Sequence, residues 1–519
     1  MRNKKQTGLI PDIKSFNSLS GILENISNIY PENIFLIENN NKWTYEEYNG
    51  LVNACCNYFT EIGLEKNDCI SLVLKNSIDF LIVYFASLRS GIVVNPFPVH
   101  VASEEIISKI EIVKPNAIFS HSQHFRSLKN CHPCVYNLDN LDGKTFFEYL
   151  QGFSLTHQNQ QIKINNDEIA ALYYSSGTTG EPKIVEYPHR SMIENQAAMF
   201  QAGCAEANAV HICFLPLGHT AALNNSVFHC ICTGSTVVMY ESFWKVRADL
   251  WNIIYKYKAT YMVVVPSILI AIMNTPYKNF SKNKVKSIKF IGCGSAFLDH
   301  NLQDEFETKF GIPVANLYGS TETGATHFDN PFEPNRKTGN IGRPLDSVKI
   351  KILDENQEEV QNDEIGEICV NSPALLKGYF KNNTSFKACF NDYYFMTGDI
   401  GYKDNNDIYY YVDRKKDMII KGGVNILPSH IDDVLQSHKS VKEVATIGIP
   451  DMFFGESIKS YIVLNKGEKL DSKALISYCR EILGDFKTPS EIEYLDEIPK
   501  GPSGKIMKRK LRERNSYGK

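Results

Sequence analysis

Short, continuous apolar runs alternate with amphipathic stretches through much of this 519-residue chain. In the first region this pattern predicts strands and helices in turn, at residues 69–74, 78–88, 91–96, 104–113 and 117–120. Further strands are expected at residues 169–173, 236–240, 260–265, 288–292 and 314–317. Uninterrupted apolar strands are buried on both faces, which is typical of parallel sheets covered by helices. The sequence therefore predicts an α/β fold.

The pattern changes from residue 348 onward. Helical periodicity fades, and β-type runs alternate with turns at residues 348–353, 367–370 and 408–412, which predicts a small β-barrel-like subdomain. The segment after Asp413 mixes strands and helices over about 100 residues, enough for a small separate domain. We expect a large N-terminal domain over residues 1–413, with two α/β subdomains and the barrel-like one. A small, mobile α+β domain is expected over 414–519.

Composition excludes several classes of protein. The formal net charge of −4 argues against a basic nucleic-acid binder. The 13 cysteines have no framework spacing, which favours reduced thiols in a cytoplasmic protein, with the CxxC at 131–134 in a loop. No apolar stretch follows the basic N-terminus, so a signal peptide is not expected. The most apolar stretch, 261–273, contains Pro266 and is too short to cross a bilayer, so it predicts a strand running into a helix.

A loop rich in glycine and hydroxyl residues, YSSGTTGEPK at 174–183, follows one predicted strand. Its backbone N–H groups and hydroxyls can bind phosphate oxygens, and Lys183 adds a positive charge. The spacing from Gly177 to Lys183, followed by Ile184, excludes a Walker A motif. Taken alone, such a loop is more simply interpreted as a solvated turn.

Further polar motifs follow in order along the chain. NLYGSTE at 316–322 comes after a predicted strand, at the edge where open α/β sheets bind ligands. It supplies a stacking face in Tyr318, a hydroxyl in Thr321 and a carboxylate suited to Mg²⁺ in Glu322. The remaining motifs are TGD at 397–399, DRKKD at 413–417, GG at 422–423 and PKGPSGK at 499–505. Each of these, taken singly, fits a turn or a solvated charge.

In this order and spacing, the motifs resemble those of the acyl- and aryl-CoA synthetases of the adenylate-forming (ANL) superfamily of AMP-dependent synthetases and ligases. The resemblance extends from Trp43 to Leu511. It implies a ligase that uses ATP and Mg²⁺ to convert a carboxylic acid to acyl-AMP and pyrophosphate, and then uses coenzyme A to form acyl-CoA and AMP. Expected partners are therefore small molecules, without nucleic acid and without a transmembrane segment.

The resemblance also assigns roles to residues. The phosphate-binding loop would comprise Ser175, Ser176, Gly177, Thr178, Thr179, Gly180 and Lys183. The adenine would lie between Tyr318 and a second segment made of Gly294, Ser295 and Ala296. Asp399 and Arg414 would hold the ribose. Two neighbours depart from the family pattern: Ile184 replaces a common glycine, and Phe297 replaces the usual proline.

The residues implied for catalysis are Thr321 at the α-phosphate, Glu322 at Mg²⁺, His219 at the carboxylate entrance and Lys505 in the adenylation step. Lys416 occupies the family's hinge position between the domains, and Gly423 falls on the loop that lines the pantetheine tunnel in CoA ligases.

The acid itself is less constrained. Peptide synthetase domains carry an aspartate shortly after the entrance histidine, and residues 220–226 contain no acid, which disfavours an α-amino acid. The expected pocket residues are Ala221, Asn225, Gly294 and Leu317, and the small ones favour a fatty or aromatic acid. Asn225 either reads a polar substituent or packs against backbone, the second being slightly favoured.

Three alternative functions remain open at this stage. The enzyme could load an acyl carrier protein instead of CoA, or it could be a luciferase-like oxygenase, although nothing indicates oxygen chemistry. A non-catalytic nucleotide-binding relative would be expected to lack Lys505, Glu322 or Asp399, and all three are present.

Overall fold

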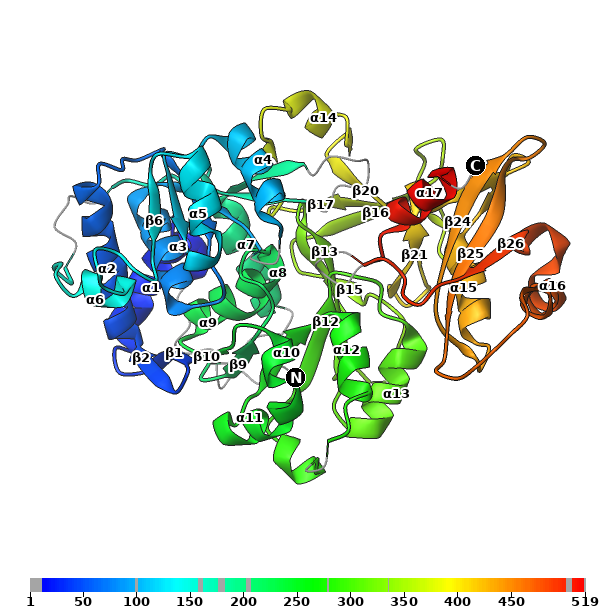
Figure 1. The fold of residues 1–519 in the computed structure, drawn as a ribbon, viewed down its shortest axis with the longest axis horizontal. Helices are drawn as coiled ribbons and strands as arrows, with labels where there is room; N and C mark the ends of the chain where they lie inside the picture. Colours follow the sequence, from blue (N-terminus) through cyan, green and yellow to red (C-terminus); the bar gives the residue numbers. More distant parts are fainter. Residues whose placement is uncertain are drawn as a thin grey trace. The chain divides into compact units, whose positions relative to one another are not determined.

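The computed structural model describes residues 12–98, 101–156, 162–175, 183–201, 207–277, 280–334, 336–500 and 506–517. The chain divides into two compact units (Figure 1). The first comprises Met1–Lys349 and Asn371–Phe390, and the second comprises Ile350–Val370 and Asn391–Lys519. The predicted domain boundary after Asp413 lies inside the second unit and stays a prediction.

A seven-stranded sheet in the first unit has the order β18-β8-β7-β4-β3-β5-β6. Its strands are β3 (Cys69–Val73), β4 (Val93–Pro96), β5 (Ala117–Ser120), β6 (Val135–Asn137), β7 (Ile169–Tyr174), β8 (Ile184–Pro188) and β18 (Gly378–Tyr379). The pairs from β7 to β6 are parallel, whereas β8 and β18 each pair antiparallel. The strands and helices predicted for residues 69–120 are confirmed with boundaries shifted by at most two residues.

Helix α3 (Ile78–Ser90) shows why these connections are helical. The Ser77 side chain accepts a hydrogen bond from the Phe80 N–H at its start, and Gly91 ends it in the left-handed conformation. Nearly every residue of α3 is buried, as expected for a helix enclosed by its neighbours. The other helices around this sheet are α2 (Tyr45–Glu61), α4 (Ser103–Val113), α5 (Ser122–Cys131) and α6 (Phe146–Leu150).

A nine-stranded sheet in the same unit has the order β15-β14-β13-β12-β11-β9-β10-β1-β2. Its strands are β1 (Ile34–Glu38), β2 (Asn41–Thr44), β9 (Val210–Cys213), β10 (Thr236–Met239), β11 (Tyr261–Val264), β12 (Phe290–Gly294), β13 (Val314–Ser320), β14 (Gly324–Phe328) and β15 (Arg343–Pro344). The pairs from β1 to β13 are parallel. The strand predicted at 288–292 is wrong by two residues, because it runs from Phe290 to Gly294.

Helices and one π-helical turn pack around the nine-stranded sheet (Figure 1). The helices are α1 (Leu19–Ile29), α7 (His189–Gln201), α8 (Thr220–Ala222), α9 (Phe228–Thr233), α10 (Phe243–Val246), α11 (Leu250–Tyr257), α12 (Pro266–Met273) and α13 (His300–Phe310). The π-helical turn Leu223–Val227 connects α8 to α9. The expected strand running into a helix at 261–273 is confirmed as β11 and α12. One continuous hydrophobic core takes side chains from both sheets.

The second unit contains two smaller sheets. The first has the order β16-β17-β20-β19, with β21 paired to β20, and no pairing among the described residues closes it into the expected barrel. Its strands are β16 (Lys349–Leu353), β17 (Gly366–Asn371), β19 (Phe390–Asn391), β20 (Tyr394–Lys403) and β21 (Tyr409–Arg414). Helix α14 (Asn383–Lys387) belongs to the segment that returns to the first unit.

The other sheet of the second unit has the order β23-β22-β25-β24, with β26 paired to β25. Its strands are β22 (Ile419–Lys421), β23 (Val424–Ile426), β24 (Val441–Asp451), β25 (Gly455–Leu464) and β26 (Glu491–Tyr494). It packs with α15 (Pro428–Gln436), α16 (Ser472–Lys487) and α17 (Lys508–Tyr517) over two local apolar clusters. The mixed α/β architecture predicted from the sequence is confirmed.

Two findings bear on the composition arguments. Across the residues that are described, no helix combines the length and the apolar character that a membrane crossing requires. All twelve cysteines within the described ranges are free thiols, and most are buried.

Candidate active site

The described ends of the phosphate loop close the hairpin between β7 and β8. The Ser175 N–H donates to the Lys183 carbonyl at 2.9 Å, and the adjacent Tyr174 is paired with Ile184. Ile184, which departs from the family pattern, is the buried first residue of β8 and packs near Val113. The predicted phosphate contacts Ser176, Gly177, Thr178, Thr179 and Gly180 lie outside the described residues.

A single tyrosine connects the loop lysine to the predicted metal ligand. The Lys183 ammonium lies 4.4 Å from the centre of the Tyr379 ring, a cation–π contact. The Tyr379 hydroxyl lies close enough to the Glu322 carboxylate for that carboxylate to raise its pKa. Burial, with smaller contributions from Glu322 and Cys389, raises the pKa of Tyr379 well above its usual range, so the phenol stays protonated and can donate. The structure therefore brings Lys183 and Glu322 to the same place.

The turn after β13 carries the other predicted nucleotide contacts. The Ser320 hydroxyl oxygen accepts from the Glu322 and Thr323 N–H groups, each at 3.2 Å. The Glu322 carbonyl also accepts from the Leu376 N–H at 3.1 Å. These bonds fix the backbone of the turn, while the side chains of Thr321 and Glu322 remain partly exposed. Tyr318, at the end of the same strand, is half-buried with its ring edge-on to His327 at 5.4 Å.

The predicted adenine-facing segment lies where β12 ends beside β13. Gly294 pairs with Leu317, and a Cβ on Gly294 would approach the Leu317 carbonyl oxygen to 2.5 Å, so only glycine fits. Ser295 follows with a left-handed φ of 65°, a conformation that costs free energy and often occurs at functional sites. Ala296 is half-buried. Phe297, the other departure from the family pattern, is 50% exposed.

A turn that is fixed from two sides carries His219. The buried Asn76 side chain accepts from the Leu217 N–H at 2.8 Å and donates to the Leu215 carbonyl at 2.8 Å. A Cβ on Gly218 would lie 2.4 Å from the Phe97 carbonyl carbon, so the turn packs directly on the backbone that follows β4. His219 is half-buried and immediately precedes α8. Asn76 was not predicted as part of the site, because no local motif contains it.

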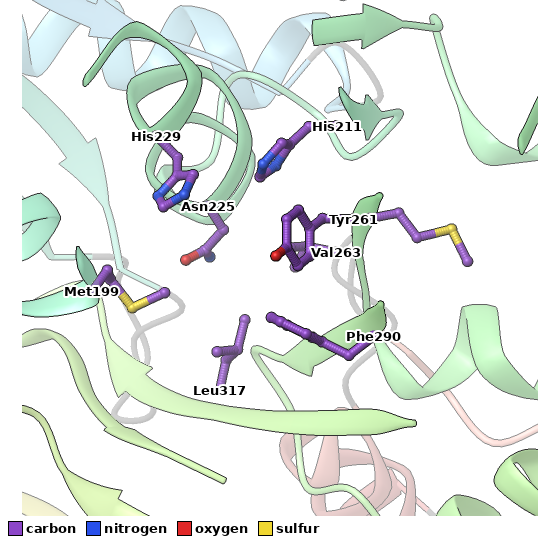
Figure 2. Close-up of a pocket in the computed structure, with 9 residues that line it drawn as sticks. Met199, His211, Asn225, His229, Tyr261, Val263, Phe290 and Leu317 are labelled. Carbon is purple, nitrogen blue, oxygen red and sulfur yellow. The ribbon is translucent and has the colours of Figure 1, made fainter. Parts of the chain in front are cut away.

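A cavity opens between the nine-stranded sheet and the helices above it (Figure 2). Among the described residues, it is lined by Met199, His211, Asn225, His229, Tyr261, Met262, Val263, Phe290 and Leu317. Two of the expected pocket residues, Asn225 and Leu317, are in this set, whereas Ala221 and Gly294 are not. The two histidines were not predicted, because they belong to no motif and resemble ordinary core residues in the sequence.

The predicted ribose contacts form an ion pair within the second unit. The Arg414 Nε lies 2.6 Å from an oxygen of Asp399, and the two residues are register partners in β20 and β21. Asp399 is 3% exposed, and its N–H donates to the Thr397 hydroxyl oxygen at 3.0 Å. Burial and strand pairing thus fix both side chains relative to each other.

The remaining predicted residues of the second unit are exposed or undescribed. Lys416 is exposed in the 3₁₀ turn Lys415–Asp417, directly after β21. Gly423 is exposed with a φ of 78°, in the tight turn between β22 and β23. Lys505 lies outside the described residues; the neighbouring Lys500 and Ile506 form an isolated antiparallel bridge.

Comparison with known proteins agrees with the motifs. Residues 23–380 match the AMP-binding enzyme family, and residues 430–505 match the AMP-binding enzyme C-terminal domain. The chain is 34% identical to a sulfoacetate–CoA ligase of Cupriavidus necator over 347 residues, which cover 66% of this chain and 67% of the relative. It is 26% identical to a crotonobetaine/carnitine–CoA ligase of Escherichia coli over 490 residues, covering 91% and 93%.

Solved structures show the same fold. The o-succinylbenzoate coenzyme A synthetase of Bacillus subtilis, solved in complex with ATP and a magnesium ion, superposes with a TM-score of 0.82 at 26% identity. The match covers 95% of this chain and 98% of that one. The chain thus belongs to the AMP-binding enzyme family and is an AMP-forming acid–CoA ligase of the adenylate-forming superfamily.

Proposed function

We propose that the protein activates a fatty or aromatic carboxylic acid with ATP and Mg²⁺, releasing pyrophosphate, and then transfers the acyl group from acyl-AMP to coenzyme A. The observation that supports the proposal is the position of Tyr379, whose ring contacts the Lys183 ammonium and whose hydroxyl lies near the Glu322 carboxylate. A cation and a carboxylate beside the same side chain would suit the phosphates and the divalent cation of a bound nucleotide. The predicted cytoplasmic location remains part of the proposal.

The residues at this position fit a magnesium ion. Mg²⁺ in nucleotide enzymes is commonly held by one or two carboxylates together with substrate phosphates and waters. Glu322 offers one carboxylate, which is partly exposed and lies near the Tyr379 hydroxyl. The ion would supply positive charge against the phosphate oxygens, which eases the approach of two anions.

The chain's own residues would do the rest of the first step. Lys183 would neutralise part of the pyrophosphate charge, and Thr321 would donate to the α-phosphate. His219, on its fixed turn, would orient the incoming carboxylate. Lys505 would stabilise charge that develops as the carboxylate attacks phosphorus, the type of interaction that lowers a barrier most. Asp399 would accept hydrogen bonds from the ribose hydroxyls, with Arg414 holding that carboxylate in place.

In the second step a thiol attacks the activated acyl carbon and AMP leaves. We propose that backbone rotation at Lys416 separates the two half-reactions and that the turn at Gly423 serves the thioester step. The exposure of Lys416 supports this role, because a hinge residue must change its dihedral angles without breaking a core.

The test is a panel of carboxylic acids assayed for pyrophosphate release from ATP, with and without CoA. The expected result is pyrophosphate only with a suitable acid and a divalent cation, and acyl-CoA when CoA is present. Release of ADP and phosphate would contradict adenylation. Transfer to a carrier-protein phosphopantetheine but not to CoA would replace the proposed acceptor with the alternative one.

A further inference from the structure

The far end of the cavity is a row of side chains across three neighbouring parallel strands. His211 pairs with Tyr261, and Tyr261 pairs with Phe290, so the three lie side by side at the starts of β9, β11 and β12. The Tyr261 ring is 5.2 Å from the His211 ring and 4.9 Å from the Phe290 ring. His229 of α9 lies over this row, 5.2 Å from His211.

The carboxyl edge of the sheet lies beyond the opposite end of the cavity. Leu317 lines the cavity and pairs with Gly294, which lies four residues after Phe290 along β12. At about 3.3 Å per residue, the row of rings is about 13 Å below the edge where the nucleotide contacts gather. Between the two levels lie Val263, which lines the cavity, and Gly292, where an added Cβ would meet the Leu317 side chain at 2.7 Å.

The two histidines have hydrogen-bonding capacity that the described residues do not use. Their side chains are 3% and 2% exposed. Within the described part of the chain, neither ring nitrogen of His211 has a hydrogen-bond partner, and the Nε2 of His229 has none either. The Asn225 backbone lies close enough to His211 to raise its pKa, but outside hydrogen-bond geometry. Unused buried donors and acceptors of this kind cost free energy and call for an explanation.

Both imidazoles are neutral at physiological pH. Burial lowers the pKa of His229 to about 4, and burial followed by the proximity of His229 lowers the pKa of His211 well below its usual value. A neutral imidazole carries one N–H donor and one acceptor nitrogen. No lysine, arginine or carboxylate lines the cavity among the described residues. This end of the pocket therefore suits a group that donates and accepts, and it provides no fixed charge for an ion.

Asn225 adds a third polar group from the π-helical turn Leu223–Val227. Figure 2 shows its amide, the two imidazoles and the Tyr261 ring arranged around a common space. Single π-turns of this kind occur often at functional sites. The cavity has room for about one water molecule. A substrate hydroxyl could reproduce the hydrogen bonds of such a water, whereas a methyl group could not.

We propose that His211 and His229 read the far end of the acyl substrate and select an acid whose apolar body ends in an uncharged hydrogen-bonding group such as a hydroxyl. The inference rests on the proposed function, since it concerns the acid that the same site activates. It narrows the fatty or aromatic class to members with a polar end.

Matched acids test the proposal on the full-length protein by ATP–pyrophosphate exchange. The probes are hexanoate against 6-hydroxyhexanoate, and 3-phenylpropanoate against 3-(4-hydroxyphenyl)propanoate, with adipate as the anionic analogue. We expect kcat/KM to be about 10- to 100-fold higher for the hydroxylated member of whichever pair reacts, the usual loss when buried polar groups are left unpaired. Equal values, or a preference for the plain acids or for adipate, would overturn the proposal without any variant.

Variants then assign the preference to the histidines. His211→Phe and His229→Phe keep a ring in each position and remove its nitrogens, so the ratio of hydroxylated to plain acid should fall to about 1 or below. His229→Gln restores a donor and an acceptor and should recover part of the ratio. Met199→Leu changes the same cavity without removing a strong polar group and should keep the wild-type ratio. A ratio unchanged in both phenylalanine variants would refute the assignment.

Different results would refute the proposed adenylation and the proposed role of the histidines. If ATP yields ADP, or if no acid supports exchange, the proposed function fails and the inference falls with it. If plain acids exchange as fast as their hydroxylated partners, adenylation stands and only the role of the histidines is refuted. Melting temperatures of all variants identify any that fail to fold, and the wild-type ratio decides the proposal in that case.

Discussion

Adding one methyl group to Gly218 should displace the turn that carries His219. The new Cβ of Gly218→Ala would lie 2.4 Å from both the Phe97 carbonyl carbon and the Pro98 nitrogen, about 1 Å closer than ordinary contact. Both are backbone atoms, which cannot rotate aside as a side chain would. Overpacking of this kind typically costs about 1–3 kcal/mol of stability. If the turn moves instead, a shift near 1 Å at a positioned group costs about 100-fold in rate.

The assay is kcat/KM for pyrophosphate release, measured with a melting curve for each protein. If the turn moves, we expect kcat/KM to fall by about 100-fold. If the turn stays in place, we expect the melting temperature to fall by a few degrees, and a partial shift should lower both values. Gly21→Ala is the matched control, because its Cβ would lie 3.5 Å from Phe16 in ordinary contact and the helix α1 favours alanine. Wild-type activity and stability in Gly218→Ala would refute the claim that this contact positions His219.

Three further outcomes follow from the site and the fold. Lys505→Ala should lower acyl-AMP formation by about 10²–10³-fold while supplied acyl-AMP and CoA still react near the wild-type rate, and an equal fall in both steps would contradict separate half-reactions. Lys416→Pro fixes φ at about −65° and should abolish one half-reaction without changing the melting temperature. If the variant keeps both half-reactions, the hinge lies elsewhere. Burial raises the pKa of Glu38 from 4.5 to about 7, and its hydrogen bond from the Ile78 N–H opposes this shift. The folded protein is therefore more stable while Glu38 is neutral, and this part of the free energy of unfolding is lost as the pH rises from 4.5 through 7. Glu38→Gln should therefore recover up to about 3 kcal/mol at pH 8 and little at pH 4, measured by denaturant unfolding.

The alternating strands and helices were predictable because each apolar run forms one buried element, so the local sequence pattern alone reveals it. β12 shows the limit of this reasoning. The strand was predicted to end at Gly292, yet it continues to Gly294, where Leu317 of the neighbouring strand packs too close for any side chain. Such a close approach depends on a strand that lies more than twenty residues later, and no local pattern contains it.

The candidate site likewise contains residues that a local motif reveals and residues that only the fold brings together. Motifs identified Lys183 and Glu322, since phosphate and metal chemistry restrict the residue types. The link between them, Tyr379, belongs to the two-residue strand β18, inside a segment whose β-type texture suggested a different subdomain. Asn76 and the two cavity histidines are also unpredictable from sequence, because their neighbours in the fold lie far away along the chain.

The π-helical turn before α9 makes the pocket sensitive to a kind of change other than substitution. A π-turn contains one residue more than the α-helix it interrupts, so deleting a single residue within Leu223–Val227 can restore regular helix. Because the wide turn absorbs that extra residue, the residues of α9 would keep their present facing and His229 would stay over His211. Asn225 belongs to the turn itself and would change its position in the cavity wall. Loss of one residue there would therefore change one polar group of the pocket and leave both histidines and the catalytic residues in place.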